Sequence, residues 1–375
     1  MLIVGAGPAG ATAALNLAPH QRVLLVEREA APRQRIGESL APAARRLLAD
    51  MGLWEDFLAQ GHAPNHGTRS LWGGAGESLY HDYMHDPDGH GWHLDRARFE
   101  SWLCAHARHR GASVLFDTQV GEISPKAGGW EAQLQGNSGS LRVEARALID
   151  ASGRNATVAR RLGARRHRTD KLVCAWLYGS DHCTTAQLSH VESEENGWWY
   201  SAPLPNRRRV LAFHTDADLP AARAARRAGW LHDQAIKLPG LGPELERAQF
   251  TPESTIRITA AHSSATSPAS GPGWFAAGDA ALSFDSLSAQ GLFHALYTGL
   301  CAAEACHRGM EGDLHAWAGY AEEIDRIAAA YRTHLGQWYG AERRWDAEPF
   351  WQRRLVATMS HSGNESQRRR VYLSE

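Results

Sequence analysis

Lysine is nearly absent from this chain. Among 40 basic residues only Lys126, Lys171 and Lys237 are lysines, so no ammonium side chain occurs before residue 126. Arginine therefore carries almost all of the positive charge, and its delocalised, permanently protonated guanidinium lacks the chemistry of an ammonium group. The formal net charge is −1, which favours neither nucleic acid nor a membrane as a partner.

Cysteines and long apolar runs are also scarce. The five cysteines are odd in number and show no C-x-x-C spacing, which favours neither a disulfide framework nor a zinc site and predicts a reducing, cytoplasmic location. No apolar run reaches about 18 residues and no signal peptide is recognisable, so we expect no membrane span and no export. A chain of 375 residues with 43% hydrophobic residues is long enough for two interleaved domains.

The beginning of the chain carries a dinucleotide-binding pattern. An apolar strand over 2–4 leads into Gly5, Gly7 and Gly10, with Gly-x-Gly-x-x-Gly spacing, and then into a helical run over 11–17. In such a pattern the first glycine allows the tight turn, the second lets the backbone approach a pyrophosphate, and the third allows close packing of the helix on the strand. The helix N-terminus then offers free N–H groups and a partial positive charge to the phosphates.

An acidic residue follows at the expected distance. A second apolar strand over 22–26 ends at Glu27, whose carboxylate is placed to accept hydrogen bonds from a ribose and to repel a 2′-phosphate. A glycine motif alone is weak evidence. The strand, glycines, helix, second strand and acid in this order predict a dinucleotide site.

A second stretch points to the same kind of cofactor. The apolar strand over 273–277 ends in Gly278-Asp279, and the segment 285–292 leads through Gly291 into a long helix up to Cys306. A carboxylate at a strand end can bind the hydroxyls of a flavin ribityl chain. A helix start can direct N–H groups at the N1–O2 edge of the flavin ring, which becomes negative on reduction. In isolation, a capped strand–helix turn explains this stretch equally well.

Other polar residues leave alternatives open. Arg35 and Ser39 could hold a phosphate or a flavin edge, or could be a surface arginine and a helix N-cap. The histidine-rich segment 81–93 more plausibly lines a sheet or a channel than a metal site, because nothing fixes the convergence of ligands, and we expect no metal. His81 and His85 are weak candidates for proton transfer.

The remaining pattern gives the expected elements. We expect a helix from N-cap Asp95 to near Gly111, hairpins over 121–144, a strand over 147–150 with a helix over 156–162, and antiparallel strands with two helical insertions over 166–254. A helical region follows Leu314, and its tail over 360–375 is polar.

These elements, together with the family resemblance carried by the motifs described next, imply an α/β (α+β) fold in which a Rossmann-type FAD-binding domain is interleaved with a β-sheet substrate domain, followed by C-terminal helices. The expected FAD-binding domain comprises 1–65, 94–165 and 255–313, the substrate domain 66–93 and 166–254, and the C-terminal helical region and tail 314–375.

Five motifs together resemble FAD monooxygenases of the p-hydroxybenzoate hydroxylase fold, which flavin-dependent halogenases and geranylgeranyl-reductase-like enzymes share. They are the glycine motif with Glu27, Arg35-Ile36-Gly37-Glu38-Ser39, Asp95-Arg96-Ala97-Arg98-Phe99, Asp150-Ala151-Ser152-Gly153-Arg154 and Gly278-Asp279-Ala280. The resemblance extends over about residues 1 to 355.

The resemblance implies a set of cofactor-binding residues. These are Gly5, Gly7, Ala9, Gly10, Glu27, Arg28, Arg35, Ser39, Arg96, Arg98, Val120, Gly278, Asp279, Gln290, Gly291 and Leu292. The glycines and Glu27 would bind the ADP half, and Arg35, Ser39 and either Arg96 or Arg98 would brace the flavin or the pyrophosphate. Asp279 would take the ribityl chain.

Within the halogenase-like branch, the sequence is most similar to flavoprotein hydroxylases that mature tryptophylquinone cofactors. Their signatures resemble the stretches 197–203, 285–291 and 342–354, although Ser286 stands where a proline is usual. Tryptophan halogenases need a lysine between the segment 37–39 and the next flavin segment, and this chain has none there. Two positions of their W-x-W-x-I-P signature are also changed, so halogenation is disfavoured.

The resemblance implies hydroxylation of an electron-rich aromatic ring through a flavin C4a-hydroperoxide, with NAD(P)H as transient reductant and O2 as co-substrate. The expected substrate is a tryptophan side chain in a protein or peptide, onto which Trp198 and Tyr200 could stack, unless they are core aromatics of the sheet. The alternatives are a flavin-dependent halogenase, an FAD-dependent reductase of a small molecule, and a flavin-bearing binding protein.

Overall fold

The structure is a computed structural model that describes residues 1–74, 78–137, 139–182 and 187–355; the polar tail expected over 360–375 lies outside these ranges. The chain forms two compact units. Unit 1 comprises 1–64, 86–170 and 262–328, and unit 2 comprises 65–85, 171–261 and the described residues from 329 onward. Both units are assembled from separate stretches of sequence. The functional domain boundaries named above stay predictions, since these units are defined by packing alone.

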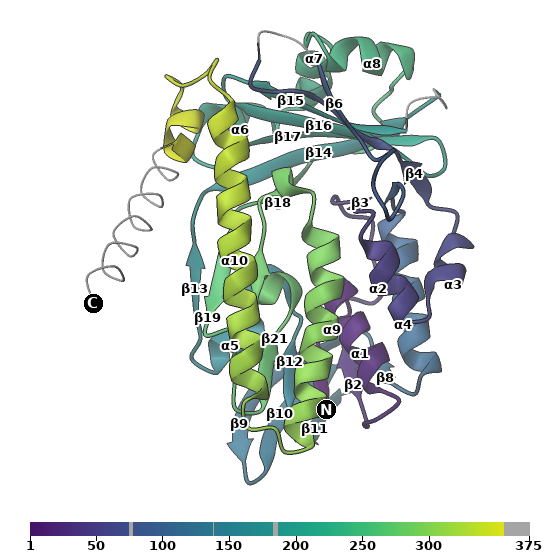
Figure 1. The fold of residues 1–375 in the computed structure, drawn as a ribbon, viewed down its shortest axis with the longest axis vertical. Helices are drawn as coiled ribbons and strands as arrows, with labels where there is room; N and C mark the ends of the chain where they lie inside the picture. The colour runs from purple at the N-terminus through teal and green to yellow at the C-terminus, as the bar shows by residue number, and fades with distance from the viewer. Residues whose placement is uncertain (75–77, 138, 183–186, 356–375) are drawn as a thin grey trace. The chain divides into compact units, whose positions relative to one another are not determined.

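Unit 1 is built on a six-stranded sheet with the order β20-β21-β12-β1-β2-β8, parallel except for β20 (Figure 1). Its central strands are short and fully buried, as expected for parallel strands covered on both faces. The strands assigned to unit 1 are β1 (Leu2–Val4), β2 (Leu24–Val26), β3 (Ser39–Leu40), β4 (Ala63–Asn65, whose last residue belongs to unit 2), β7 (Gly91–His93), β8 (Ser113–Leu115), β9 (Thr118–Lys126), β10 (Gly129–Gly136), β11 (Gly139–Ala145), β12 (Leu148–Asp150), β13 (Arg165–Arg168), β19 (Ser264–Ser267), β20 (Ser270–Gly271), β21 (Trp274–Ala276) and β22 (Leu282–Ser283).

Helix α1 packs against both α4 and α9 in unit 1. The N-cap expected at Asp95 is confirmed, because its side chain accepts a hydrogen bond from the N–H of Arg98 at the start of α4. The helices of unit 1 are α1 (Pro8–Leu17), α2 (Ala44–Asp50), α3 (Trp54–Leu58), α4 (Arg96–His109), α5 (Thr157–Arg161) and α9 (Gly291–Met310), with 3₁₀ turns η1 (Gly153–Asn155), η2 (Gly278–Ala280) and η3 (Ser286–Ser288).

Some elements differ from those expected. Helix α1 begins at Pro8, because proline needs no hydrogen-bond acceptor at the first helical position. The helix expected over 156–162 is present as the shorter α5, and Ala156, whose φ is +43°, separates it from the preceding turn η1. Ser39 is not a helix cap; it lies in β3, paired with His93 of β7.

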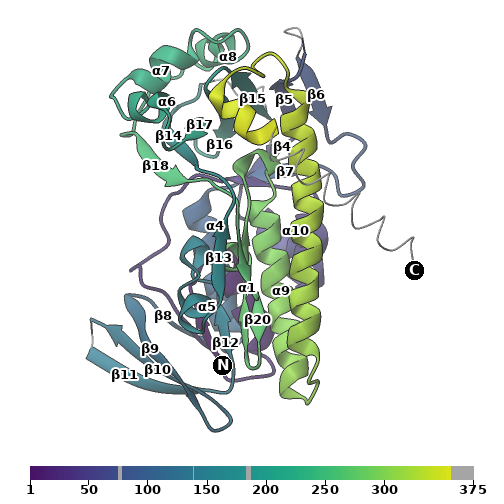
Figure 2. The ribbon, with the colours of Figure 1, turned by 90° about the vertical axis from the view of Figure 1, so that its left-hand side faces the viewer.

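Unit 2 is built on a seven-stranded sheet with the order β18-β14-β17-β16-β15-β5-β6. Three short helices lie along one face of this sheet (Figure 2) and cover a core that includes Trp199, Leu211 and Phe213. The elements are β5 (Gly67–Leu71), β6 (Leu79–Asp82), β14 (Leu172–Ser180), β15 (Leu188–Glu194), β16 (Gly197–Leu204), β17 (Arg208–Asp216), α6 (Pro220–Ala224), α7 (Trp230–Ala235), α8 (Leu241–Arg247) and β18 (Arg257–Ala260).

The two helical insertions expected in the middle of the chain are a single insertion after β17. Pro220 stands at the first position of α6, while Gly229 and Gly240 precede α7 and α8, so these residues divide the insertion into three helices. Helix α10 (Ala316–Ala341) contributes its residues up to 328 to unit 1 and the rest to unit 2.

The C-terminal segment packs on the rest of unit 2. Trp351 is buried and donates its indole N–H to the carbonyl of Glu194, and the carboxylate of Glu342 accepts hydrogen bonds from Gly73 and Ser193. The α/β class expected from the sequence is confirmed.

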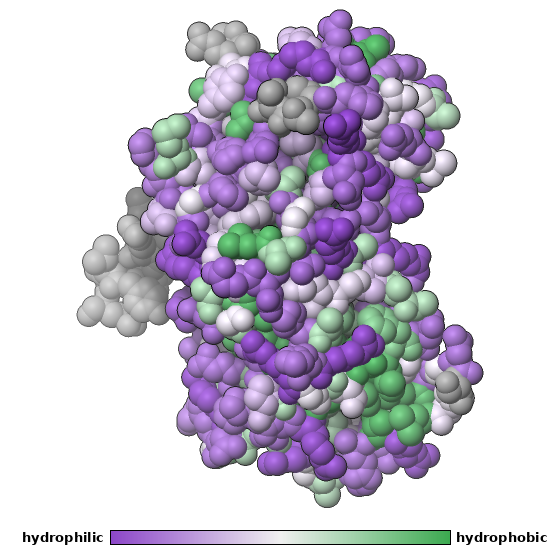
Figure 3. All heavy atoms as spheres, turned by 90° about the vertical axis from the view of Figure 1, so that its right-hand side faces the viewer, coloured by the Kyte–Doolittle hydropathy of each residue, from purple (hydrophilic) through white to green (hydrophobic). Residues whose placement is uncertain are grey.

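Hydrophilic residues cover most of the face shown in Figure 3, and none of the helices in the described part of the chain could cross a membrane.

Candidate cofactor site

The glycine motif lies between the end of β1 and the N-terminus of α1. Gly5 has φ +103°, and a Cβ there would lie 2.2 Å from the carbonyl oxygen of Ala151. A Cβ at Gly10 would lie 1.8 Å from the carbonyl oxygen of Gly5, whereas a Cβ at Gly7 would meet no atom within 4 Å. The packing of the protein itself thus requires two of the glycines, and the third leaves open space beside the helix start. No side chain caps α1, so its first N–H groups can bind an anion.

Glu27 lies beside this helix start. Its Oε2 accepts a hydrogen bond from the N–H of Ala6 at 2.8 Å, and its Oε1 accepts one from Glu29 at 3.1 Å. The N–H of Thr118 donates to the carbonyl of Glu27 at 2.9 Å, which brings the start of β9, and with it Val120, next to the end of β2. The carboxylate is therefore held in place at the strand end, where a ribose would need it.

Arg35 and Arg96 meet at Glu100 on α4. Glu100 is 1% exposed; its Oε1 accepts from Nη2 of Arg96 at 2.5 Å, and its Oε2 lies 3.1 Å from Nη2 of Arg35. Nη1 of Arg96 also donates to the carbonyl of Gly37 at 2.7 Å. The Nε of Arg96 is buried and has no acceptor among the described residues. A buried donor of this kind fits an oxygen supplied by a ligand.

Arg98 and Arg28 make their contacts with other residues. Arg98 is exposed and donates to the carbonyl of Gln60 at 2.6 Å, so the structure places Arg96, and not Arg98, beside Arg35. Arg28 is largely exposed, 3.6 Å from Glu29. The cofactor roles of Arg28, Arg98 and Ser39 stay predictions.

Two arginines hold the Gly278-Asp279 turn. Arg154 lies 3.4 Å from the carboxylate of Asp279 and donates to the carbonyls of His262 and Phe284. Arg166 donates to the carbonyl of Asp279 at 2.7 Å, and burial lowers the pKa of Arg166 to about 10, which leaves it protonated at neutral pH. The carboxylate of Asp279 is itself partly exposed and available to a ligand.

Helix α9 joins this turn to the glycine motif. The N–H of Gly278 donates to the hydroxyl of Thr298 at 2.8 Å. A Cβ at Gly278 would lie 2.8 Å from Cβ of Ala9, and one at Gly299 would lie 2.4 Å from the carbonyl of Ala9. The start of α1 and the middle of α9, at Gly299, are thus packed together at Ala9.

The N-terminus of α9 is open in the same way as that of α1. Its N-cap Gln290 makes no side-chain cap, a Cβ at Gly291 would meet no atom within 4 Å, and Leu292 is buried beneath. Two uncapped helix starts, two strand-end carboxylates and a buried arginine donor without an acceptor lie within unit 1. The N–H and guanidinium donors fit the phosphates and ring edge of FAD, and the carboxylates fit its hydroxyls as acceptors.

The predicted substrate residues lie in unit 2. Trp198 is 1% exposed, stacks on His214 with ring centroids 3.6 Å apart, and donates to the hydroxyl of Tyr339 at 3.2 Å. Since side chains alternate along β16, Trp198 and Tyr200 lie on the face opposite to Trp199 and the helices. Only Tyr200 of the two is partly exposed, so a stacking role for Trp198 would require its packing to open.

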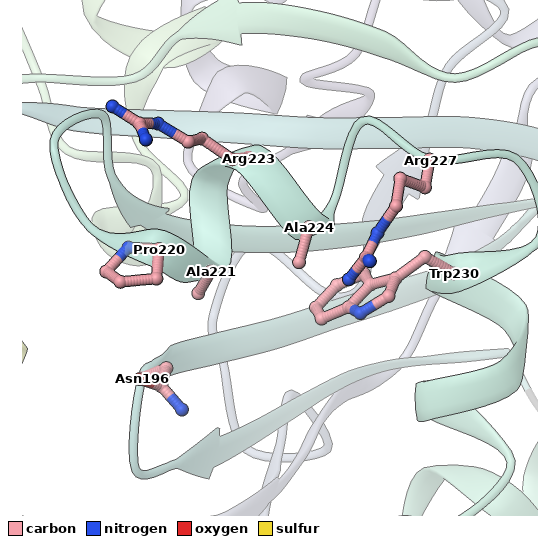
Figure 4. Close-up of a pocket in the computed structure, with 7 residues that line it drawn as sticks. All are labelled: Asn196, Pro220, Ala221, Arg223, Ala224, Arg227 and Trp230. Carbon is pink, nitrogen blue, oxygen red and sulfur yellow. The ribbon is translucent and has the colours of Figure 1, made fainter.

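His81 and His85 are exposed; His81 lies on the edge strand β6, where its ring meets that of Tyr83 edge-on with centroids 5.5 Å apart, so their roles in proton transfer stay predictions. No group of three or more His, Cys, Asp or Glu side chains in the described residues could hold a metal. A pocket of about 500 Å³ in unit 2, lined among others by Arg227 and Trp230 (Figure 4), contains none of the predicted residues.

Sequence reasoning gave no role to Glu100, Arg154 or Arg166. Glu100 follows Arg96 by four residues, a spacing that pairs side chains on a helix and could have indicated the contact. Arg166 donates to the turn at Asp279, 113 residues away in sequence, and no pattern in the residues around Arg166 indicates this contact.

Residues 1–296 match the model of the family described as "FAD binding domain". The chain belongs to this family. The putative FAD-dependent oxidoreductase LodB of Marinomonas mediterranea is 31% identical to it over 94% of this chain and 96% of that protein. The chain is thus an FAD-dependent oxidoreductase, with FAD as cofactor and with the NAD(P)H and O2 typical of the family.

Two further relatives differ in activity. The tryptophan 2-halogenase of Chondromyces crocatus is 26% identical over 90% of this chain and 66% of that protein. The solved structure of the peptidyl tryptophan dihydroxylase QhpG, described as essential for tryptophylquinone cofactor biogenesis, aligns with a TM-score of 0.73 at 26% identity, covering 94% of this chain and 77% of that one.

Proposed function

We propose that this chain is an FAD-dependent monooxygenase that hydroxylates a tryptophan side chain in a protein or peptide precursor of a tryptophylquinone cofactor. Likeness to QhpG over almost the whole chain supports this substrate class. Halogenases share this fold with the hydroxylase QhpG, so the fold does not distinguish halogenation from hydroxylation. The residues of this chain must do so.

The observation that carries the proposal is the position of the three lysines. The side chains of Lys126 and Lys171 are 45% and 61% exposed and are paired with Glu144 and Asp218, and Lys237 is also exposed. No lysine is therefore enclosed in a site where an ammonium could receive hypohalous acid beside a substrate. Arginine cannot take that role. Hydroxylation of an indole needs no such amine, because the ring is already electron-rich.

In this proposal the residues of unit 1 bind and orient the cofactor. FAD, when bound, supplies the activation of dioxygen with electrons from NAD(P)H. The helix starts and Arg96 bind its anionic groups, Glu27 and Asp279 accept hydrogen bonds from its hydroxyls, and Arg154 and Arg166 keep the Asp279 turn in one conformation. No side chain is assigned as a proton acceptor.

Mass spectrometry of a candidate precursor protein tests the proposal. The precursor is incubated with the FAD-loaded chain, NAD(P)H and air, and we expect a gain of about 16 or about 32 mass units, one or two oxygen atoms, on one tryptophan. With oxygen-18 gas in place of air, the gain should rise by about 2 mass units for each oxygen atom inserted. Reactions without reductant or without dioxygen are the controls, and an unchanged precursor in the complete reaction would contradict the proposal.

Halogenation is the second candidate, because the tryptophan 2-halogenase relative extends over 90% of the chain. The same assay with chloride or bromide distinguishes it. A gain of about 34 mass units with a chlorine isotope pattern, on free tryptophan or on the precursor, would assign halogenation in place of hydroxylation.

A further inference from the structure

A buried carboxylate joins two of the arginines at the cofactor site. Each oxygen of Glu100 faces a different guanidinium, that of Arg96 at 2.5 Å and that of Arg35 at 3.1 Å. Glu100 and Arg96 are almost completely buried, whereas the side chain of Arg35 is 49% exposed. The cluster therefore runs from the interior of unit 1 to its surface and carries one net positive charge.

The backbone around the cluster fixes Arg96. Its Nη1 donates to the carbonyls of Gly37 and Ile36 at 2.7 and 3.4 Å. Gly37 has φ +97°, a backbone conformation that favours glycine, and a Cβ there would lie 3.2 Å from this Nη1, close enough that Arg96 would have to shift. Nη1 and Nη2 are both engaged, and the buried Nε has no acceptor within the part of the chain that the structure describes.

The same face of α4 reaches the glycine motif. Cys104, one turn after Glu100, has its sulfur 3.4 Å from the carbonyl oxygen of Ala6, between Gly5 and Gly7. The pKa of Cys104 is raised to about 12 by burial and by the nearby carboxylates of Glu100 and Glu27. The carboxylate that pairs the two arginines therefore lies one helical turn from the contact between α4 and the loop that offers N–H groups to an anion.

We infer that Glu100 is a positioning residue for the diphosphate of FAD: it holds Arg35 and Arg96 in place before the cofactor binds, so that the free Nε of Arg96 and the exposed Arg35 present positive charge beside the glycine loop. Glu100 itself does not contact the cofactor. A negative charge placed near a diphosphate would otherwise weaken binding, and the gain from a prearranged arginine pair outweighs that repulsion.

Glu100→Gln tests this, because it removes the charge while keeping the shape and one hydrogen-bond acceptor. If Glu100 positions the arginines, the Kd for FAD rises about tenfold or more, as expected when a charged hydrogen-bond partner is lost. ADP serves as a competing probe of the diphosphate site, and its Kd should rise by a similar factor. The Kd of riboflavin, which has no phosphate, should not change. Glu100→Asp should recover part of the FAD affinity.

Glu304→Gln is the matched control, since Glu304 and Arg308 form another i,i+4 pair, at 3.9 Å, that is exposed on α9. Affinities are measured on the folded cofactor-free fraction, with thermal unfolding followed in parallel. An unchanged or tighter FAD affinity in Glu100→Gln would overturn the inference, because repulsion by the carboxylate would then be its dominant effect. Equal weakening of riboflavin and ADP would also overturn it and leave Glu100 a merely structural residue. None of these readouts depends on the identity of the substrate.

Discussion

The Nε of Arg154 lies 3.4 Å from Oδ2 of Asp279, across two turns that follow adjacent parallel strands. Asp150, at the end of β12, accepts hydrogen bonds from the N–H groups of Ser152, Val158 and Ala159 and so fixes the turn that carries Arg154. Asp279 follows β21, the next strand in the sheet. The carboxyl ends of neighbouring parallel strands thus bring the two charges together, which is where open α/β sheets bind ligands.

Asp279→Asn should weaken FAD binding about tenfold to a hundredfold, because hydrogen bonds to a charged acceptor are worth about 1.5–3 kcal/mol. Fluorescence titration of the cofactor-free protein with FAD measures this. Asp313→Asn is the control, since Asp313 is also 3.4 Å from an arginine, Arg308, but lies after α9 away from the turn. Equal FAD affinity in both variants would exclude a ligand role for Asp279.

Gly7 and Gly10 should respond in opposite ways to alanine. The Cβ of Gly10→Ala would collide with the carbonyl of Gly5, so this variant should lower the unfolding temperature of the cofactor-free protein. Gly7 has φ −70° and open space around its Cβ position, so Gly7→Ala should fold normally and lose FAD affinity. Thermal unfolding without FAD, followed by FAD titration, separates the two effects. Normal FAD binding by Gly7→Ala would show that no phosphate approaches this residue.

Much of unit 1 was predictable because its signals are local. The strand, glycine motif, helix and acid of 2–27 follow in sequence, and the N-cap at Asp95 and the hairpins β9–β11 depend on neighbouring residues. The sequence also indicated that the Gly278-Asp279 turn and the glycine motif serve one cofactor, and the packing of α9 against Ala9 provides the contact between them.

The rest could not be predicted because it depends on tertiary contacts. From the sequence, Trp198 could equally well stack on a substrate or belong to the core. Only its ring stack on His214 and its hydrogen bond to Tyr339 show that it is buried. The residues next to Arg35 in sequence are typical of a protein surface. Its guanidinium is nevertheless paired with the carboxylate of Glu100, one turn after the start of α4. Neither environment leaves a signal in the local sequence.

Glu342 should stabilise unit 2 in a pH-dependent way. It is buried, and hydrogen bonds from Arg344, Gly73 and Ser193 lower its pKa to about 2 in spite of the opposing effect of burial. Its folded pKa lies below its unfolded value, so its stabilisation is present above about pH 4.5 and is lost as the pH falls toward 2. Glu342→Gln should lower the free energy of unfolding at pH 7 by about 1–3 kcal/mol and by roughly half as much at pH 3, measured by urea unfolding. An equal loss at both pH values would mean that the charge of Glu342 contributes nothing.

His214 should make the protein less stable in mild acid. Burial lowers its pKa to about 3, so the folded protein keeps the ring neutral while the unfolded chain binds a proton below about pH 6.5. Stability should therefore fall as the pH drops from 6.5 toward 3, with a contribution of about 1.4 kcal/mol per pH unit from this one residue. His214→Phe keeps a flat ring against Trp198 and removes the titration, so it should reduce that slope by about one proton. The exposed His109→Phe is the matched control. Urea unfolding at several pH values between 4 and 6.5 gives the slopes, and identical slopes in the His214→Phe variant and the parent protein would show that the buried ring takes up its proton as readily in the folded state as in the unfolded one.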